Sequence, residues 1–379
     1  MYKALIKKIL PLLLIGIVIT GFNSCQTYKQ LSAPPKVDTN GIVRDMSNNS
    51  DTATIADIPW KEYFTDPDLQ ALIKEGLENN INLQVALTRI KQAEAYLSMA
   101  KGNSLPDVSA GFQVDHTRTS NGNNGRDILG YVSHQNSLGF SASWEIDLWG
   151  KLASKSKVRY AAYLNSFEYR NLVQTELIAN IANAYYNLLA LDRQLQTTKE
   201  TIILLEKSAE TIVALKEAGK QNAAAVEQSY ALLYSTQLTI PELENQIHEQ
   251  ENAICALLGR KPGTIKRSSI DNQLVNTNLK LGIPAQLLSR RPDVKQAELD
   301  VLAAYATTDV AKASFYPSLT ITSASFGLAS GNFSDFFKPE NLAANFIAGL
   351  TQPIFNRKLL KGNLKLAESQ QEETLLTFS

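Results

Sequence analysis

The stretch LGFSASWEIDLWGK, residues 138–151, joins a strand pattern directly to a helix pattern. Apolar side chains occupy the even-numbered positions from Leu138 to Leu148, and small or polar side chains occupy the odd-numbered ones. This period of two predicts a β-strand with one apolar face. From Leu152 to Ala218 there is no glycine and no proline, and a helix through these 67 residues would be about 100 Å long.

A coiled-coil seam runs along this predicted helix. Its apolar positions recur at alternating spacings of four and three, so the helix must pack lengthwise on other helices. The seam consists of Leu177, Ile181, Ala184, Leu188, Leu191, Leu195, Thr198, Ile202, Leu205, Ala209 and Ile212. After a turn at 219–222, a second helix is predicted over 223–258, which Pro241 is expected to bend or locally weaken.

Another strand is predicted before the opening stretch. Residues 108–115 also alternate, and the polar segment 117–137 is expected to be a loop, so the two strands form a hairpin. Each strand has about the 9 to 11 residues that a tilted strand needs to cross a bilayer. Further upstream, helices are predicted to start at Pro67 and to cover 83–101.

The chain contains an internal two-fold repeat. Aligning Pro106 with Pro317, a shift of 211 residues, matches a helix, an X-Pro step and a strand in both copies. The second strand of the hairpin also recurs, because 142–151 matches 348–357. A second hairpin is therefore predicted.

The second copy is less regular and shorter. Ser323 and Gln352 interrupt its alternation, and 327–345 is expected to be a loop. The first copy devotes 151–259 to its helical hairpin, whereas 357–379 is all that follows in the second. We therefore expect a truncated second copy, which could not supply its share of a tunnel wall for a functional pump.

The N-terminus has the features of a secretory signal peptide. Lysines at positions 3, 7 and 8 precede an apolar run over 9–19, which is too short for a good membrane-spanning helix. Cys25 then follows small and polar residues and resembles the lipoprotein box in which the thiol is acylated, although Phe22 and Asn23 depart from the usual box. An ordinary cleaved signal peptide is the alternative. With lipidation, Gln26 at the next position favours transfer to the outer membrane.

Four predicted strands per chain set the expected assembly. They are too few to close a barrel, and open edges are not tolerated in lipid because unpaired backbone groups there cost several kcal/mol each. Subunits must therefore share one barrel. Two, three or four copies are possible, and we favour three because 12 strands leave a lumen whereas eight fill their own interior. The predicted fold class is an α+β membrane protein with a shared trimeric 12-stranded β-barrel, continued by a long α-helical coiled-coil barrel.

Several motifs in order resemble the TolC-like outer-membrane factor family, in particular the lipoprotein channels of tripartite multidrug efflux pumps. The matching segments are Trp60 with FTDPDL at 64–69, 80–86, WEIDLWGK at 144–151, 240–244, 251–259 and LSRRPDV at 288–294. This resemblance implies a homotrimer with its barrel in outer-membrane lipid and a tunnel across the periplasm. It also implies that the tunnel tips meet a periplasmic adaptor protein and an inner-membrane efflux transporter. In the family a second helical hairpin builds much of the gate, so no gate residue is assigned.

The predicted domain organisation follows the strand and helix patterns. Its segments are a signal peptide at 1–24, a lipid-anchored arm at 25–58, equatorial helices at 59–105, the first barrel hairpin at 106–149, the tunnel hairpin at 150–262, a linker with the helix of the second copy at 263–316, the second barrel hairpin at 317–356, and the start of a second helical hairpin at 357–379.

The candidate site residues fall in three places. Cys25 is the candidate lipidation site, and Glu145 and Asp147, at the spacing of one strand face, are candidates for facing a water-filled lumen. The candidates for adaptor contact lie at the tip of the helical hairpin and are Ala218, Gly219, Lys220 and Gln221.

Neither catalysis nor a cofactor is expected. The three histidines, His116, His134 and His248, are isolated in the sequence and are interpreted as solvated polar residues rather than metal ligands. Cys255 lies in an apolar helix end and is interpreted as buried. Balanced charge, with 37 basic and 37 acidic residues, gives no electrostatic reason to expect nucleic acid.

The favoured function is a passive exit duct for drugs or other small molecules, energised by its partners. A duct for secreted polypeptides and a non-conducting periplasmic coiled-coil lipoprotein are the alternatives. The matched alternating strands argue against the last, because a soluble scaffold has little need of strands of membrane length.

Overall fold

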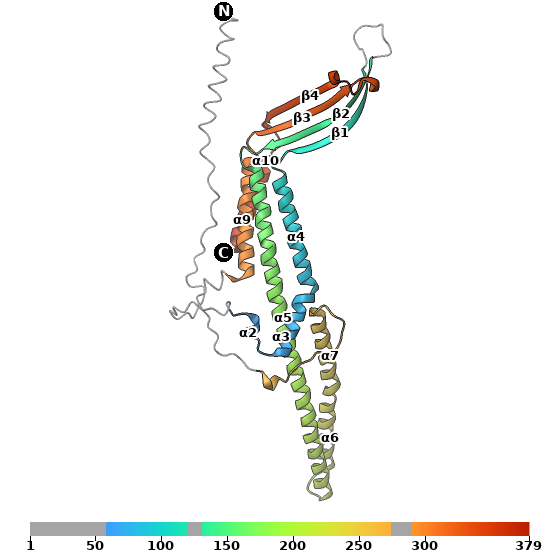
Figure 1. Cartoon of the computed structure of the whole chain (residues 1–379). Coiled ribbons are helices and arrows are strands. Elements are labelled where there is room, and N and C mark those ends of the chain that lie inside the picture. Colours follow the sequence, from blue (N-terminus) through green and yellow to red (C-terminus); the bar gives the residue numbers. More distant parts are fainter. Residues whose placement is uncertain (1–57, 120–130, 274–289, 379) are drawn as a thin grey trace, which may run out of the picture. The chain divides into compact units, whose positions relative to one another are not determined.

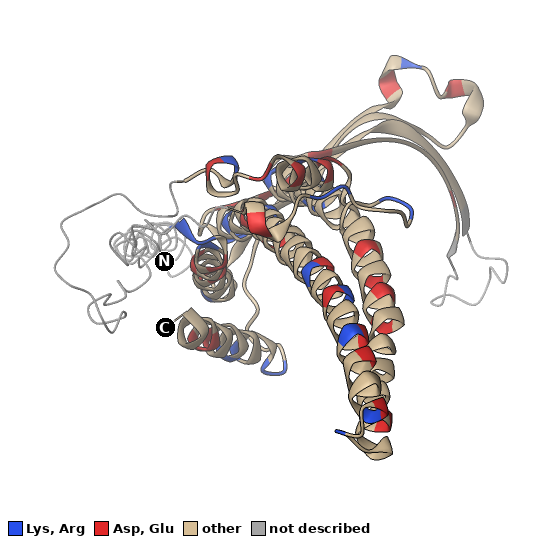
Figure 2. Cartoon of the chain, turned by 90° about the horizontal axis from the view of Figure 1, so that it is seen from below, with Lys and Arg blue, Asp and Glu red and all other residues tan. Residues whose placement is uncertain are grey.

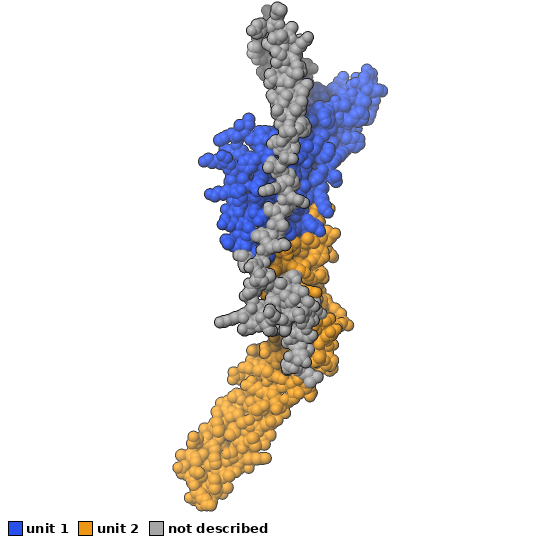
Figure 3. All heavy atoms as spheres, turned by 90° about the vertical axis from the view of Figure 1, so that its left-hand side faces the viewer, with its two compact units in different colours: residues 1–37, 99–161, 300–379 blue, residues 38–98, 162–299 orange. Residues whose placement is uncertain are grey.

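A computed structural model describes residues 58–119, 131–273 and 290–378 of the chain. The predicted signal peptide, Cys25 and almost all of the predicted arm therefore lie outside the described residues. The chain divides into two compact units, which Figure 3 shows in different colours. One unit comprises the described residues within 99–161 and 300–378, and the other comprises those within 58–98 and 162–299.

Short helices open the described chain, and the start of the second at Pro67 is as the sequence predicts. Helix α2 spans Trp60–Tyr63 and α3 spans Pro67–Asn79 (Figure 1). The Asp66 carboxylate accepts hydrogen bonds from the N–H groups of Asp68 and Leu69 and so caps α3, with Pro67 in the first turn. Helix α4 spans Ile81–Gly102, two residues earlier than predicted and one residue later.

The long helix is present with its predicted length. Helix α5 spans Lys151–Glu217, 67 residues, and α6 returns over Ala223–Gln237. Helix α7 then spans Thr239–Leu257, so the returning helix is interrupted at Leu238. Pro241 lies in the first turn of α7 and has no N–H to donate to the preceding turn, which accounts for the break. The expectation that Pro241 weakens the ladder is confirmed.

The hydrophobic core of the second unit lies where α3, the start of α4, α5 and α7 converge. Its fully buried side chains include Leu69, Ile73, Ile181, Tyr185, Leu188, Ile254, Cys255 and Leu258. Gly76 of α3 faces Ile181, and a Cβ there would lie 2.5 Å from the Ile181 Cδ1. Glycine at this position lets the two helices approach without displacing the Ile181 side chain. The burial of Cys255 agrees with the expectation from the sequence.

Four antiparallel strands form one curved sheet in the order β1-β2-β3-β4 (Figure 1). The strands are β1 Asp107–Thr119, β2 Tyr131–Ile146, β3 Ser318–Ser330 and β4 Leu342–Thr351. They are longer than predicted: residues 117–119, 131–137, 327–330 and 342–345 belong to strands, so the expected loops at 117–137 and 327–345 are too long. Backbone pairing continues there although the apolar alternation has ended.

The irregular alternation of the second copy has a structural cause. The register of β3 shifts against β2 between Ala142 and Trp144, and against β4 between Ile321 and Ser323. One extra residue of β3 at 322–323 accounts for both shifts, which makes it a β-bulge. Ser323 thus interrupts the pattern without ending the strand, whereas Gln352 lies beyond the end of β4.

Helices α9 at Pro292–Ala313 and α10 at Leu359–Phe378 complete the described chain. Helix α9 begins and ends 211 residues after α4, and β3 begins and ends 211 residues after β1. The element bounds thus follow the shift of the sequence repeat. Three short 3₁₀ turns lie in the connections that the structure describes: Ile270–Asn272, Phe333–Asp335 and Pro339–Asn341.

Candidate functional site

The sheet has one continuous apolar face. The strand register places Val108 opposite Ala142, Ala110 opposite Phe140, and Phe112 opposite Leu138, and β3 and β4 continue the same rows. The face comprises Val108, Ala110, Phe112, Val114, Leu138, Phe140, Ala142, Trp144, Ile146, Leu319, Ile321, Ala324, Phe326, Leu328, Leu342, Ala344, Phe346, Ala348 and Leu350.

Within the single chain this apolar face is largely uncovered. Phe140, Phe326 and Phe346 are 63%, 57% and 68% exposed. An apolar patch that spans four strands is far more than isolated exposed residues would give, and it indicates a surface that another apolar phase covers. Among the described helices, none has the length and hydropathy needed to cross a membrane.

The opposite face of the sheet is small and polar. Ser109 and Ser141 lie opposite each other with their hydroxyls 2.8 Å apart. The charged residues of this face, among the described strand positions, are Asp107, Asp115 and Glu145. Glycine, serine, threonine and asparagine make up most of the rest, so the sheet combines a lipid-compatible face with a water-compatible one.

The two predicted lumen residues differ in their surroundings. Glu145 lies on the polar face opposite Thr320 and forms an ion pair with Lys151 in the first turn of α5. Asp147 does not share its strand face, because β2 ends at Ile146. Its carboxylate instead accepts a 2.8 Å hydrogen bond from the N–H of Ala153, at the N-terminus of α5. The expected pairing of the two acids along one strand is therefore wrong.

Two tryptophans fix the passage from strands to helices. The Trp149 indole stacks on Tyr316 with ring centroids 5.1 Å apart and donates a 2.6 Å hydrogen bond to the Pro317 carbonyl. The Trp144 indole donates to the Ser104 carbonyl at 3.0 Å. Gly150 has a φ of 73°, in the region that favours glycine, where the chain turns into α5.

The tip of the helical hairpin forms as predicted. Helix α5 ends at Glu217, Gly219 has a φ of 72°, and Asn222 caps α6 by accepting a hydrogen bond from the N–H of Ala225. All four candidate contact residues, Ala218, Gly219, Lys220 and Gln221, are exposed. Figure 2 shows basic and acidic residues interspersed along the helices.

A buried carboxylate joins three segments of the second unit. One oxygen of Asp66 accepts hydrogen bonds from Tyr185 at 2.8 Å, Ser268 at 2.6 Å and Gln273 at 2.7 Å, while the other caps α3. Burial alone raises the pKa of Asp66, but these donors outweigh burial and lower it from 3.8 to about 2. Burial beside this carboxylate raises the pKa of Tyr185 to about 12.

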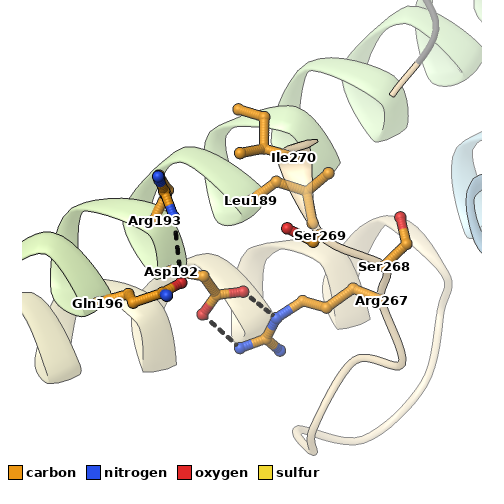
Figure 4. Close-up of a pocket in the computed structure, with 8 residues that line it drawn as sticks. All are labelled: Leu189, Asp192, Arg193, Gln196, Arg267, Ser268, Ser269 and Ile270. Carbon is orange, nitrogen blue, oxygen red and sulfur yellow. Dashed lines mark hydrogen bonds and ion pairs between the residues drawn. The ribbon is translucent and has the colours of Figure 1, made fainter. Parts of the chain in front are cut away.

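The guanidinium group of Arg267, called the arginine fork below, links the segment after α7 to helices α5 and α7. Arg267 donates to both carboxylate oxygens of Asp192 at 2.5 and 2.9 Å (Figure 4). It also donates to Glu251 at 2.5 Å. Glu251 also accepts the N–H of Ile265 at 3.2 Å. A shallow polar pocket of about 280 Å³ beside this fork is lined by Leu189, Asp192, Arg193, Gln196 and 267–270.

The fork raises the pKa of Arg267, chiefly through the hydrogen bond to Asp192. Burial by itself raises the pKa of Glu251, but the hydrogen bonds from Arg267 and Ile265 lower it overall. Every charged group in this network thus has its partner. We interpret it as a structural clamp rather than a site of chemistry.

Sequence reasoning missed this clamp and one further contact. Asp192, Glu251 and Arg267 lie far apart in the sequence, and no pattern links them. His116 and His134, expected to be isolated, are register partners on β1 and β2 with their rings in contact, so that expectation is wrong. In the described ranges, no group of three or more His, Cys, Asp or Glu side chains is placed to hold a metal ion.

A two-faced antiparallel sheet joined to helices of this length is the architecture of outer-membrane channel proteins. The chain belongs to the outer membrane efflux protein family, whose model matches residues 72–260 and 283–378. It is therefore an efflux protein of the outer membrane, in a family of efflux proteins rather than enzymes.

Individual relatives agree with this assignment. The chain is 27% identical over 376 residues to the cation efflux system protein CusC of Escherichia coli O6:H1, covering 98% of this chain and 79% of that protein. It is 29% identical over 339 residues to the probable outer membrane lipoprotein SilC of Salmonella typhimurium, covering 88% of this chain and 72% of SilC. A crystal structure of CusC, in a study of folding and transmembrane channel formation, superimposes with a TM-score of 0.75 at 26% identity and covers 89% of this chain and 78% of that one.

Proposed function

We propose that three copies of this chain share one 12-stranded β-barrel in the outer membrane and form a passive exit duct. The observation that carries this proposal is the pair of open edges on an amphipathic sheet. Within the described residues, β1 and β4 each have a strand neighbour on one side only. Their free backbone groups need partners if the apolar face lies in lipid.

Neighbouring copies of the chain can supply hydrogen-bond partners for the free backbone groups of β1 and β4. Pairing β4 of one chain with β1 of the next repeats the antiparallel order and removes every edge after closure. Three copies of four strands give a barrel wide enough for a water-filled lumen, whereas two copies would give eight strands and a filled interior. The internal repeat, supported by the matching bounds of α4 with α9 and of β1 with β3, provides each chain with two similar hairpins.

In this assembly the polar face lines the lumen. Asp107, Asp115 and Glu145 then contribute carboxylates to the wall, and Asp147 lies at the entrance where strands give way to helices. The apolar face meets lipid. Because acidic residues are the charged groups of this face in the described strands, the pore is expected to favour cations.

The helical hairpins of the three copies continue the duct through the periplasm as a coiled-coil barrel. The tip residues Ala218–Gln221 are exposed and lie at the end farthest along α5 from the strands, where a periplasmic adaptor can contact them. An inner-membrane transporter of the same tripartite pump supplies the energy and selects the cargo, which we assign to drugs or other small molecules. Cys25 provides the lipid anchor.

Conductance in a planar lipid bilayer tests this proposal. The purified protein should insert and give discrete, long-lived conductance steps, because a lumen that excludes lipid carries ions continuously. A variant with Pro within an edge strand, Ala344→Pro in β4, should give few or no steps since proline removes a backbone donor. Membrane-inserted protein without conductance steps would exclude an open duct.

A further inference from the structure

Two histidines are in contact across the first hairpin, and the proposed duct assigns no role to either of them. His116 of β1 and His134 of β2 are direct register partners. Their ring centroids lie 4.4 Å apart with the ring planes at 83°, and the Nδ1 atom of each ring faces the Nδ1 atom of the other. Both side chains are exposed. The pair lies two residues beyond Val114 and Asn136, toward the far end of the hairpin.

This arrangement brings the two Nδ1 atoms together at one point. In a neutral imidazole one nitrogen carries the proton and the other accepts, so the observed contact needs one ring to donate its Nδ1–H to the other. If both rings instead carry their proton on Nε2, both Nδ1 lone pairs are free. A cation placed between them then takes the position of the shared proton, and no proton has to leave the protein.

Among the described residues of β1 and β2, no acidic side chain shares the face of the pair. The neighbouring residues along each strand, Asp115 and Gln135, belong to the opposite face of the sheet because successive side chains alternate. Asp115 instead accepts hydrogen bonds from Gln113, on its own face. The ligand set is therefore two imidazoles on one paired backbone, with water available to complete the coordination of an exposed ion.

We propose that His116 and His134 form a two-histidine site for a divalent transition-metal ion that clips β1 to β2. Imidazole nitrogen suits Zn²⁺, Ni²⁺ and Cu²⁺, whereas Mg²⁺ and Ca²⁺ prefer oxygen. Zinc–nitrogen bonds are about 2.0 to 2.1 Å long, so the rings need only small rotations to straddle the ion. Both rings are exposed and free to make them. The site is a property of the hairpin and does not depend on the number of subunits.

Electron paramagnetic resonance of Cu²⁺ bound to the full chain in detergent tests the site. The spectrum should show two equivalent nitrogen ligands at one bound copper per chain. His116→Asn and His134→Asn should each reduce the signal to a single nitrogen and weaken Cu²⁺ binding by at least about tenfold, because a chelate becomes a single ligand. Zn²⁺ should displace the copper and Mg²⁺ should not.

The chain supplies its own control, because His248 is its third and last histidine. It is exposed on α7, where its partner is Glu251, and His248→Asn should leave the two-nitrogen spectrum unchanged. The site is excluded if His248→Asn abolishes the signal, or if His116→Asn leaves it intact.

A second measurement uses the protein without substitutions, so its result does not depend on whether the variants fold. Diethyl pyrocarbonate modifies accessible histidines, and Zn²⁺ should protect His116 and His134 by at least about tenfold while His248 reacts at its usual rate. Equal reactivity of all three histidines with and without Zn²⁺ would overturn the proposal.

Discussion

Gly139 of β2 and Gly327 of β3 lie directly opposite each other, and neither position has room for a side chain. A Cβ at Gly327 would lie 2.2 Å from the Leu138 carbonyl oxygen and 2.5 Å from the Gly139 Cα. A Cβ at Gly139 would lie 2.6 Å from the Phe326 carbonyl oxygen. Because the atoms in the way are backbone, the two hairpins can approach this closely only through glycine.

Gly327→Ala should therefore destabilise the sheet, by about 1 to 3 kcal/mol, because the β2 and β3 backbones must move apart. The check is the midpoint of thermal unfolding in detergent. Gly111→Ala is the matched control: Gly111 pairs with Gly139 in the same row, but a Cβ there meets nothing within 4 Å. Equal midpoints for the two variants would contradict the close approach of the hairpins.

Arg267→Met should destabilise the helical unit by about 2 to 4 kcal/mol, because it leaves Asp192 and the buried Glu251 without their cation. Glu251 is 5% exposed, so water cannot replace the lost partner fully. Chemical denaturation followed by circular dichroism measures the change. Lys199→Met, which breaks an exposed pair with Glu244, should cost less than about 1 kcal/mol. If Arg267→Met lowers the free energy of unfolding by no more than Lys199→Met does, the clamp does not stabilise the fold.

The Asp66 network predicts a loss of stability in acid. The pKa of Asp66 falls from 3.8 to about 2 on folding, so the native state holds the proton more weakly than the unfolded state. The resulting stabilisation, about 2 kcal/mol, is complete above pH 4 and is lost as the pH falls through 2.

Unfolding measured at several pH values between 5 and 2 should show this loss, and Asp66→Asn should remove that part of the dependence. Asp68→Asn is the matched control, because Asp68 pairs with an exposed lysine, Lys266. If Asp68→Asn and Asp66→Asn flatten the acid dependence equally, the effect does not come from the buried network.

Ion selectivity tests the placement of Glu145 and Asp147 in the lumen. Replacing both, as Glu145→Gln with Asp147→Asn, should shift the reversal potential in a salt gradient toward zero, because the wall loses negative charge. Asparagine still accepts the N–H of Ala153, so the start of α5 is kept. An unchanged reversal potential would place these carboxylates outside the conducting path.

The sequence predicts the elements better than their ends and their contacts. Alternation from Leu138 to Leu148 identifies β2, but the strand begins at Tyr131, where backbone pairing with β1 continues past the apolar pattern. Ser323 interrupts the alternation because a bulge shifts the period by one residue. In both cases the ends and the register of the strand depend on its pairing with a neighbouring strand. A local sequence pattern carries no information about that pairing.

The candidate site shows the same limit. The absence of glycine and proline predicts α5 with its observed length, and Gly219 predicts the hairpin tip. Asp147 is different, because its role as a cap depends on where β2 leaves the sheet. The Arg267 clamp and the His116–His134 pair each join residues from separate segments, so the fold alone brings them together.

Cross-linking of the two sheet edges in outer membranes tests the shared barrel most directly. In a variant with both Ser109→Cys on β1 and Gly349→Cys on β4, a short bismaleimide should join adjacent chains and yield a ladder that ends at the trimer. Each single variant should remain monomeric, because its cysteine has no partner on the neighbouring edge. Cys255 is buried, and in the lipidated protein the thiol of Cys25 is blocked. A double variant that stays monomeric, or a ladder that ends at two or four chains, would contradict the trimeric barrel.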